Sequence, residues 1–596
     1  MFLLLFASCF GDHEGASPPQ DLLGVTYVVF APEGADSPLR SPILLGGEAR
    51  PALVAPTPAE FRYRLEVPQR ALLTFAVGIA TEPGVEAEGK VALGGRMRFT
   101  VRAGEKNAEE VVFDRAIHVS RRDRWLPQTV DLKRYAGREV WLVFQTEFPA
   151  YEPAEGLLPI AGVFGEPVLH DRSAYRNSTG VVLVSIDTLR RDHLSLYGYS
   201  RRTTPGLEAL ARQSVVFEDA VSTSSWTLPA HASLMTSTYP GAHGATTSKA
   251  GLSPEWPGLA RLLNDAGYFT QAMVTHVYLS TEYGFGEGFD RHRYLPETRA
   301  EEVTSHAIRF LEARGDANFF LFLHYYDPHW HYDPPAPYDR TFDPSYQGKT
   351  SGIWWDFKDL DRSSIAPADL NHIRALYDGE ILYTDRQLER LIQEMKRLGV
   401  FENALIVVTS DHGEEFLDHG RWEHQKTLYE EQLRIPLLIR FPRGAWGSTR
   451  VSDQVSLVDV APTMLETLGV PAPPTYQGRS LLDVVRGRSR EAADEAWAET
   501  EHTLDGSRKI ALRRGARGPK SVFTLKDGSV AIEHFDLGRD PGEKRDLGAS
   551  RGTALEDELE AYLADLDEWR RGRGLVPEVE LDPDDLERLR SLGYVK

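Results

Sequence analysis

The 596-residue sequence has a single cysteine, a deficit of basic residues and no long apolar run. One cysteine excludes an internal disulfide framework and a cysteine-based zinc site. The 67 Lys and Arg are outnumbered by 88 Asp and Glu, and the formal charge of −21 argues against non-specific nucleic-acid binding. Because no run of 18 apolar residues occurs, the sequence predicts no transmembrane helix. The remaining composition is that of a globular protein with about two to four domains.

The single cysteine, Cys9, follows a short apolar stretch at the start of the sequence. Residues 1–6 read MFLLLF, and Ala7 and Ser8 precede the cysteine. This order resembles a bacterial lipoprotein signal, in which the cysteine becomes the lipidated N-terminus. The stretch has no Lys or Arg, which a signal peptide carries, so a plain apolar terminus is the alternative. We expect residues 1–22 to be a signal and tether. The protein would then be exported, periplasmic or at the cell surface, and would meet the membrane only through a lipid anchor on Cys9.

Residues 23–172 have the pattern of an all-β domain. Strand-forming runs such as 71–80, 91–101 and 140–147 alternate with Gly and Pro clusters, and no long helical period occurs. This pattern predicts a β-sandwich. The segment 125–144 resembles the carbohydrate-binding-like jelly-roll modules that are often attached to secreted hydrolases. A sandwich that serves only as a spacer is the alternative to one that binds sugar.

The pattern changes near residue 180, where strands of the fully buried type begin to alternate with helical stretches. Four continuous apolar runs lie at 181–186, 319–323, 405–408 and 436–439. Such runs are typical of strands that are buried on both faces. The alternation predicts an α/β domain over residues 178–486, with a parallel or mixed sheet that is covered by helices on both faces.

Residues 487–596 predict a smaller C-terminal subdomain. Short antiparallel strands are expected between 510 and 537, and a helix between 554 and 571.

Polar residues directly follow three of the predicted buried strands. They are Asp187 after the first strand, His324, Asp327 and His329 after the second, and Asp411 and His412 after the third. In an open α/β sheet the active residues gather at the carboxyl ends of the strands. A single Asp could merely cap a helix, but carboxylates and imidazoles from three strand ends are what a divalent metal needs. The pattern therefore predicts a metal site at this edge.

Six motifs occur in a fixed order along the α/β segment. They are 186–199 (IDTLRRDHLSLYGY), 225–236 (SWTLPAHASLMT), 327–332 (DPHWHY), 409–414 (TSDHGE), 423–436 (EHQKTLYEEQLRIP) and 458–463 (VDVAPT). This series resembles the sulfatase family of the alkaline phosphatase superfamily. The resemblance implies a mixed α/β sheet flanked by helices, a small-sheet C-terminal subdomain and one or two divalent metals. It also implies in-line displacement at a sulfate or phosphate ester of a small molecule or glycan.

The resemblance implies the metal ligands residue by residue. Asp187 stands at the family's first metal-binding aspartate, and Asp411 and His412 stand at its later metal-binding pair. The family often has a second Asp after the first, where this chain has Thr188. Calcium, manganese, magnesium and zinc are all candidates for an oxygen and imidazole ligand set.

Three further residues match positions that bind the ester group in the family. His329 matches the histidine of the Asp-Pro-His-x-x-Tyr segment, and His424 matches a late histidine or lysine. Lys426 lies one residue from the usual spacing of a basic group that neutralises a tetrahedral anion. We expect all three to stabilise the ester oxygens.

The nucleophile position departs from the family pattern. Sulfatases carry Cys or Ser in a Cys/Ser-x-Pro-Ser-Arg motif, and that residue is oxidised to formylglycine. Here Thr227 takes the nucleophile position and His231 replaces the arginine. Oxidation of a threonine would give a ketone, so we expect Thr227 to act directly, as nucleophile and metal ligand, as in phosphodiesterase and phosphotransferase branches of the superfamily. A helix N-cap for Thr227 and a purely structural hydrogen bond for His231 are the alternatives.

The alternative function is glycan binding. In that case the chain would be a catalytically weakened family member whose β-sandwich and former active-site pocket bind a glycan. The intact Asp187, Asp411 and His412 argue against it, because a dead pocket has no need of a ligand cluster. The sequence also favours no ligand role for His276, which could line the pocket.

Overall fold

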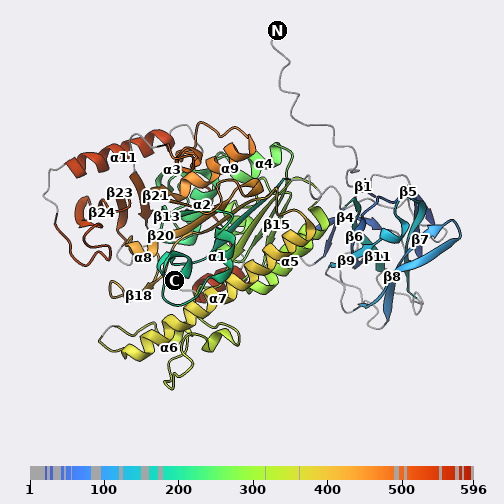
Figure 1. The fold of residues 1–596 in the computed structure, drawn as a ribbon, viewed down its shortest axis with the longest axis horizontal. Coiled ribbons are helices and arrows are strands. Elements are labelled where there is room, and N and C mark those ends of the chain that lie inside the picture. The colour runs from blue at the N-terminus through green and yellow to red at the C-terminus, as the bar shows by residue number, and fades with distance from the viewer. Residues whose placement is uncertain are drawn as a thin grey trace, which may run out of the picture. The chain divides into compact units, whose positions relative to one another are not determined.

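The structure is a computed structural model that forms two compact units, residues 1–178 with 311–317, and residues 179–310 with 318–596 (Figure 1). It describes residues 20–22, 27–30, 42–45, 48–54, 57–81, 95–119, 125–148, 160–171, 179–315, 317–361, 363–488, 495–501, 506–548, 554–570, 576–579, 581 and 583–591. Cys9 and almost all of the expected signal lie outside these ranges. Among the helices of the described ranges, none combines the length and the apolar character that a membrane crossing requires.

The first unit contains two antiparallel sheets. The first has the order β3 (Pro42–Leu45), β4 (Glu48–Val54), β11 (Ile160–Asp171), β6 (Ala71–Thr81) and β9 (Leu126–Asp131), and β1 (Gln20–Asp21) also pairs with β11. The second has the order β2 (Tyr27–Phe30), β5 (Ala59–Glu66), β10 (Glu139–Glu147), β7 (Arg96–Glu105) and β8 (Ala108–His118). The strand expected at residues 91–101 corresponds to β7, which begins at Arg96.

An aromatic core joins the two sheets of this unit. Alternate residues of β5 are buried, as expected for a strand that has one face on the core and the other toward solvent. Phe75 of the first sheet packs edge-on against Phe144 of the second, with 5.6 Å between ring centroids, and Phe99 packs against Phe164 at 5.5 Å. Because both inner faces contribute to one core, this unit is the expected β-sandwich.

An eight-stranded mixed sheet forms the centre of the second unit. Its order is β15 (Arg291–Tyr294), β14 (Phe269–Val274), β16 (Phe319–Tyr325), β12 (Gly180–Ile186), β17 (Leu405–Ser410), β20 (Arg434–Arg440), β13 (Val215–Val221) and β21 (Thr449–Ser456). Strand β12 is parallel to both β16 and β17, and Ile186 aligns with Tyr325 on one side and Ser410 on the other. This register brings the carboxyl ends of the three strands to one edge.

Helices cover both faces of the central sheet. Figure 1 shows α2 (Thr227–Thr236), α4 (Leu259–Asp265) and α9 (Val460–Leu468) on one side and α7 (Pro367–Leu398) on the other. Val181 and Leu183 of β12 belong to the core that includes α2, α4 and α9. Val182 and Val184 face α7 and α1 (Pro205–Ala211) instead. The continuous apolar strand is therefore explained by burial on both faces, and the expected fold class is confirmed.

The other α-helices and strands of the described residues between 179 and 488 are short, except α5, whose last residues, from 311 on, fall in the first unit. They are α3 (Pro240–His243), α5 (Ala300–Arg314), α6 (Trp354–Phe357), β18 (Glu415–Phe416), β19 (Trp422–Glu423), α8 (Glu430–Leu433) and α10 (Leu482–Val485).

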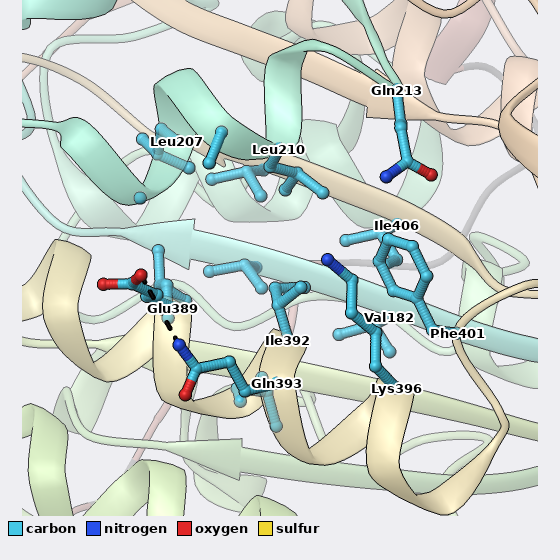
Figure 2. A pocket seen from close by; sticks show the side chains of 16 residues that line it. Val182, Leu207, Leu210, Gln213, Glu389, Ile392, Gln393, Lys396, Phe401 and Ile406 are labelled. Carbon is cyan, nitrogen blue, oxygen red and sulfur yellow. Dashed lines mark hydrogen bonds between the residues drawn. The ribbon is translucent and has the colours of Figure 1, made fainter.

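A cavity of about 110 Å³ lies between β12, β17, α1 and α7. Figure 2 shows Leu207 and Leu210 of α1 facing Ile392 of α7 across it. The lining is mainly apolar, and it includes none of the residues that the sequence assigns to the site. We therefore treat this cavity as a packing feature of the helix layer.

The C-terminal part forms a four-stranded antiparallel sheet, followed by helices. It comprises β22 (Glu495–Thr500), β23 (Arg508–Arg514), β24 (Pro519–Lys526), β25 (Ser529–Asp536), α11 (Ala554–Arg570) and α12 (Pro583–Ser591). Lys520 of β24 is fully buried and lies 3.1 Å from Glu430 of α8 and 2.8 Å from Glu543. Buried charges thus tie this small sheet to the α/β core.

Candidate active site

The site lies at the carboxyl ends of β12, β16 and β17. Asp187 follows β12, His324 is the penultimate residue of β16, and Asp411 follows β17. All three side chains are fully buried. They come together because the three neighbouring strands are parallel and in register.

Asp187, Asp411 and His412 form a compact triad. Nε2 of His412 lies 3.2 Å from Oδ2 of Asp411 and 3.7 Å from Oδ1 of Asp187. Both oxygens of Asp187 and Oδ2 of Asp411 are buried without a hydrogen-bond partner in the described part of the chain. Burial, together with repulsion from Asp411, raises the pKa of Asp187 well above its usual value. Unpaired buried carboxylates are costly, and either protonation or a bound cation removes that cost.

The protonation of His412 suits a metal ligand. Its Nδ1–H donates to the carbonyl of Gly413 at 2.9 Å, which leaves the lone pair of Nε2 directed at the two carboxylates. Burial lowers the pKa of His412 to about 4, so the ring is neutral at pH 7. A neutral imidazole with two carboxylates is a ligand set for a divalent metal, and the residues therefore fit the metal that the family resemblance implies.

Thr227 is the first residue of α2, and its hydroxyl faces the triad. The N-cap position belongs to Trp226, so the alternative of Thr227 as an N-cap is wrong. Oγ1 of Thr227 lies 3.5 Å from Nε2 of His412, and the residue is fully buried. The first turn of a ten-residue helix adds a partial positive charge at this point. The hydroxyl is thus close to the metal ligands and in a field that favours an anion.

His231 lies one helical turn after Thr227 and contacts the same group. Its Nδ1 is 2.9 Å from the carbonyl of Thr227 and 3.5 Å from Oδ2 of Asp411. Its Nε2 is 2.9 Å from Oγ of Ser185. The residue is therefore both a structural hydrogen bonder and a neighbour of the triad.

His424 lies beside His412 and His329 lies beside His424, whereas Lys426 makes a different contact. The ring centroid of His424 is 4.5 Å from that of His412 and 5.2 Å from that of His329. Nδ1 of His424 lies 3.2 Å from Oε1 of Glu414. Lys426 forms an ion pair with Glu423 and, in the described ranges, none with the triad. The structure thus brings His329 and His424 to the site, whereas the Lys426 ammonium pairs with the Glu423 carboxylate.

Two histidines in this cluster are missing from the predicted site. Nε2 of His324 lies 3.5 Å from Oδ2 of Asp187, and His276, Asp187 and His329 have possible ligand atoms within 4.8 Å of one another. His276 follows strand β14 by two residues, so the strand-end rule that singled out Asp187 could have found it. His324 belongs to the strand-end pattern that predicts a metal site, but the family resemblance assigns it no role.

Two family models match the sequence. "Sulfatase" covers residues 179–470, and "N-sulphoglucosamine sulphohydrolase, C-terminal" covers residues 418–568. The chain belongs to the sulfatase family. The family models and the sulfatase relatives indicate an enzyme of the sulfuric ester hydrolase class.

Named relatives and solved structures agree with the sulfatase assignment. The chain is 22% identical to N-acetylglucosamine-6-O-sulfatase of Bacteroides thetaiotaomicron, over 66% of this chain and 87% of the relative. It is 25% identical to an arylsulfatase of Clostridium perfringens, over 62% and 89%. The phosphonate monoester hydrolase of Agrobacterium radiobacter shares the fold, with a TM-score of 0.55, 22% identity and coverage of 66% and 96%. The sulfatase fold is thus established, and the chemistry at Thr227 depends on the side chains of this chain's own site.

Proposed function

We propose that this sulfatase-family enzyme hydrolyses sulfate or phosphate esters by direct attack of the unmodified Thr227 hydroxyl. A divalent cation held by Asp187, Asp411 and His412 would assist. The observation that most supports this proposal is the position of Oγ1 of Thr227, 3.5 Å from Nε2 of His412 and beside carboxylate oxygens that have no partner among the described residues.

The chemistry of the ligands defines what the cation would supply. A divalent ion bound there would neutralise the carboxylates, polarise the ester and ease loss of the hydroxyl proton. The site has no competing protein cation, since neither Asp187 nor Asp411 is ion-paired with a lysine or arginine in the described residues.

Thr227 would act in two displacement steps. In the first, its oxygen forms a bond to the sulfur or phosphorus while the bond to the leaving oxygen breaks, and the alcohol leaves with a proton. In the second, water attacks the ester on Thr227, restores the hydroxyl and releases sulfate or phosphate. His424 packs against His412, and His329 packs against His424. Nδ1 of each ring contacts an acceptor, the carbonyl of Trp330 for His329 and Oε1 of Glu414 for His424, so Nε2 of each would donate to an ester oxygen only in the protonated ring.

The substrate class rests on two separate arguments. The relatives are named for sulfate esters, including one of N-acetylglucosamine, so the family favours a sulfated sugar or small molecule. A threonine that attacks directly, together with histidine in place of the family's arginine, favours a phosphate ester. The two readings differ in their preferred substrate and share the same nucleophile.

The test compares substrates and Thr227 variants side by side. The protein is made in a host without formylglycine-generating enzymes and assayed with aryl sulfate, aryl phosphate, phosphodiester and phosphonate substrates. Calcium, manganese, magnesium and zinc are each added. We expect turnover of at least one substrate, loss by at least about 1,000-fold in Thr227→Ala and measurable activity in Thr227→Ser. Wild-type turnover by Thr227→Ala would overturn the role of Thr227, and no turnover of any ester would favour the glycan-binding alternative.

A further inference from the structure

A second group of potential ligands shares Asp411 with the triad. It consists of His231 from α2 and His324 from β16, whose ring centroids are 5.0 Å apart, together with Asp411. All three side chains are fully buried. We propose that His231, His324 and Asp411 hold a second divalent cation, of the zinc type, next to the one held by Asp187, Asp411 and His412.

The tautomer of His324 carries most of this argument. Oγ1 of Thr275 lies 2.7 Å from Nδ1 of His324 and 3.3 Å from the carbonyl of the same residue, and the arrangement that uses both contacts has the hydroxyl donating to the carbonyl and accepting from Nδ1–H. Nε2 then has a lone pair, which faces Oδ2 of Asp187 at 3.5 Å. Neither atom has a hydrogen-bond partner in the described ranges. Two buried acceptors that face each other repel, and a cation between them removes this repulsion.

His231 has the second-sphere contact of a metal-binding histidine. Its Nε2–H can donate to Oγ of Ser185 at 2.9 Å, and this sets the ring orientation. Its Nδ1 then lies 3.5 Å from Oδ2 of Asp411. Nδ1 also lies 2.9 Å from the carbonyl of Thr227, which can only accept, so without a cation the ring proton is on Nδ1 and Nε2 accepts from the Ser185 hydroxyl. Binding of a cation at Nδ1 exchanges this hydrogen bond for a metal bond, and the ring proton moves to Nε2, which then donates to Oγ of Ser185, with no net release of a proton.

The two carboxylates are arranged to be shared between two ions. Oδ1 of Asp187 faces His412, and its Oδ2 faces His324. Oδ1 of Asp411 accepts backbone N–H groups of Thr188 and His412, which leaves Oδ2 between His412 at 3.2 Å and His231 at 3.5 Å. Bridging carboxylates of this kind are typical of two-metal sites, with ions about 3.5–4 Å apart.

The donor atoms also select the kind of ion. Calcium and magnesium prefer oxygen ligands, whereas two imidazole nitrogens with a carboxylate suit zinc, cobalt or manganese. The second position stands on its own contacts and requires neither Thr227 as the nucleophile nor a particular ester.

Metal content per chain tests the inference without any substrate. The purified protein is stripped with a chelator, reconstituted with zinc, freed of excess metal and analysed by mass spectrometry of the elements. We expect about two zinc ions per chain in the wild type, and about one in His324→Ala and in His231→Ala. The control is His372→Ala, a histidine that stacks on Tyr346 away from the site and should leave two ions bound.

Two outcomes would overturn the second site. One is a single zinc per chain in the wild type, and the other is two zinc ions retained in both site variants. If circular dichroism shows that the variants do not fold, cobalt(II) titration of the wild type decides, because its absorption saturates at two equivalents for two sites and at one for a single site. A protein with two ions but no ester turnover would support this inference and contradict the proposed function.

Discussion

Replacing Asp411 with asparagine should change stability in opposite directions with and without metal. The substitution keeps an oxygen that can accept the backbone N–H groups of Thr188 and His412, at 3.3 and 2.9 Å in the wild type. It also removes the negative charge from a fully buried position. The charge of Asp411 repels that of the neighbouring Asp187, so its removal relieves this repulsion. The metal-free protein should therefore be stabilised, while the metal-bound protein should lose its ligand.

The magnitudes follow from the two states. In the metal-free protein, removal of one of two repelling buried carboxylates should raise the free energy of unfolding by about 1–3 kcal/mol. In the wild type, a metal at 1,000 times its Kd adds about 4 kcal/mol, and Asp411→Asn should lose most of it. Catalytic turnover should fall by at least about 1,000-fold, because the cation is no longer held beside Thr227.

Thermal unfolding with chelator and with added zinc measures both effects. Asp411→Asn should melt a few degrees above the wild type in chelator and below it in metal. Asp359→Asn, an exposed carboxylate that pairs with Lys358, is the matched control and should change neither value by more than about 0.5 kcal/mol. If Asp411→Asn were equally destabilised with and without metal, the carboxylate would be held by the protein itself, and the metal assignment would be refuted.

Three further experiments give separate tests of the nucleophile, the lipid anchor and the buried ion pair. Acid quenching of turnover should trap a sulfate or phosphate ester on Thr227, detected by peptide mass spectrometry, and an unlabelled Thr227 during steady turnover would contradict a covalent route. Cys9→Ser should release the protein from the membrane fraction, whereas unchanged association would remove the lipid-anchor expectation. Lys520→Met should lower the free energy of unfolding by about 3–5 kcal/mol in chemical denaturation, because it leaves Glu543 buried without the cation it pairs with, while Glu430 keeps Arg513, and a change under about 1 kcal/mol would show that the Glu543 carboxyl is already neutral.

Several features of the site could be predicted from residue order alone. Asp187, Asp411 and His412 were expected from their positions after apolar runs, and the structure brings them together because those runs are neighbouring parallel strands. The position of Thr227 near the triad followed from its motif. The first residue of the helix is harder to predict from the sequence, because Pro229 suits the first turn of a helix that begins at any of several residues. In the structure, α2 begins at Thr227 itself.

The order of residues along the chain predicts the layered α/β architecture, the sandwich before it and the edge of the sheet that holds the site. Continuous apolar strands are buried on both faces and alternating ones on one face, so these patterns report burial directly. Which polar groups share a carboxylate depends on the three-dimensional packing. His231 and His324 are 93 residues apart and come from a helix and a strand, so no spacing rule relates them. Their approach to Asp187 and Asp411 depends on strand register and on the docking of α2, both of which are set by packing across the whole domain.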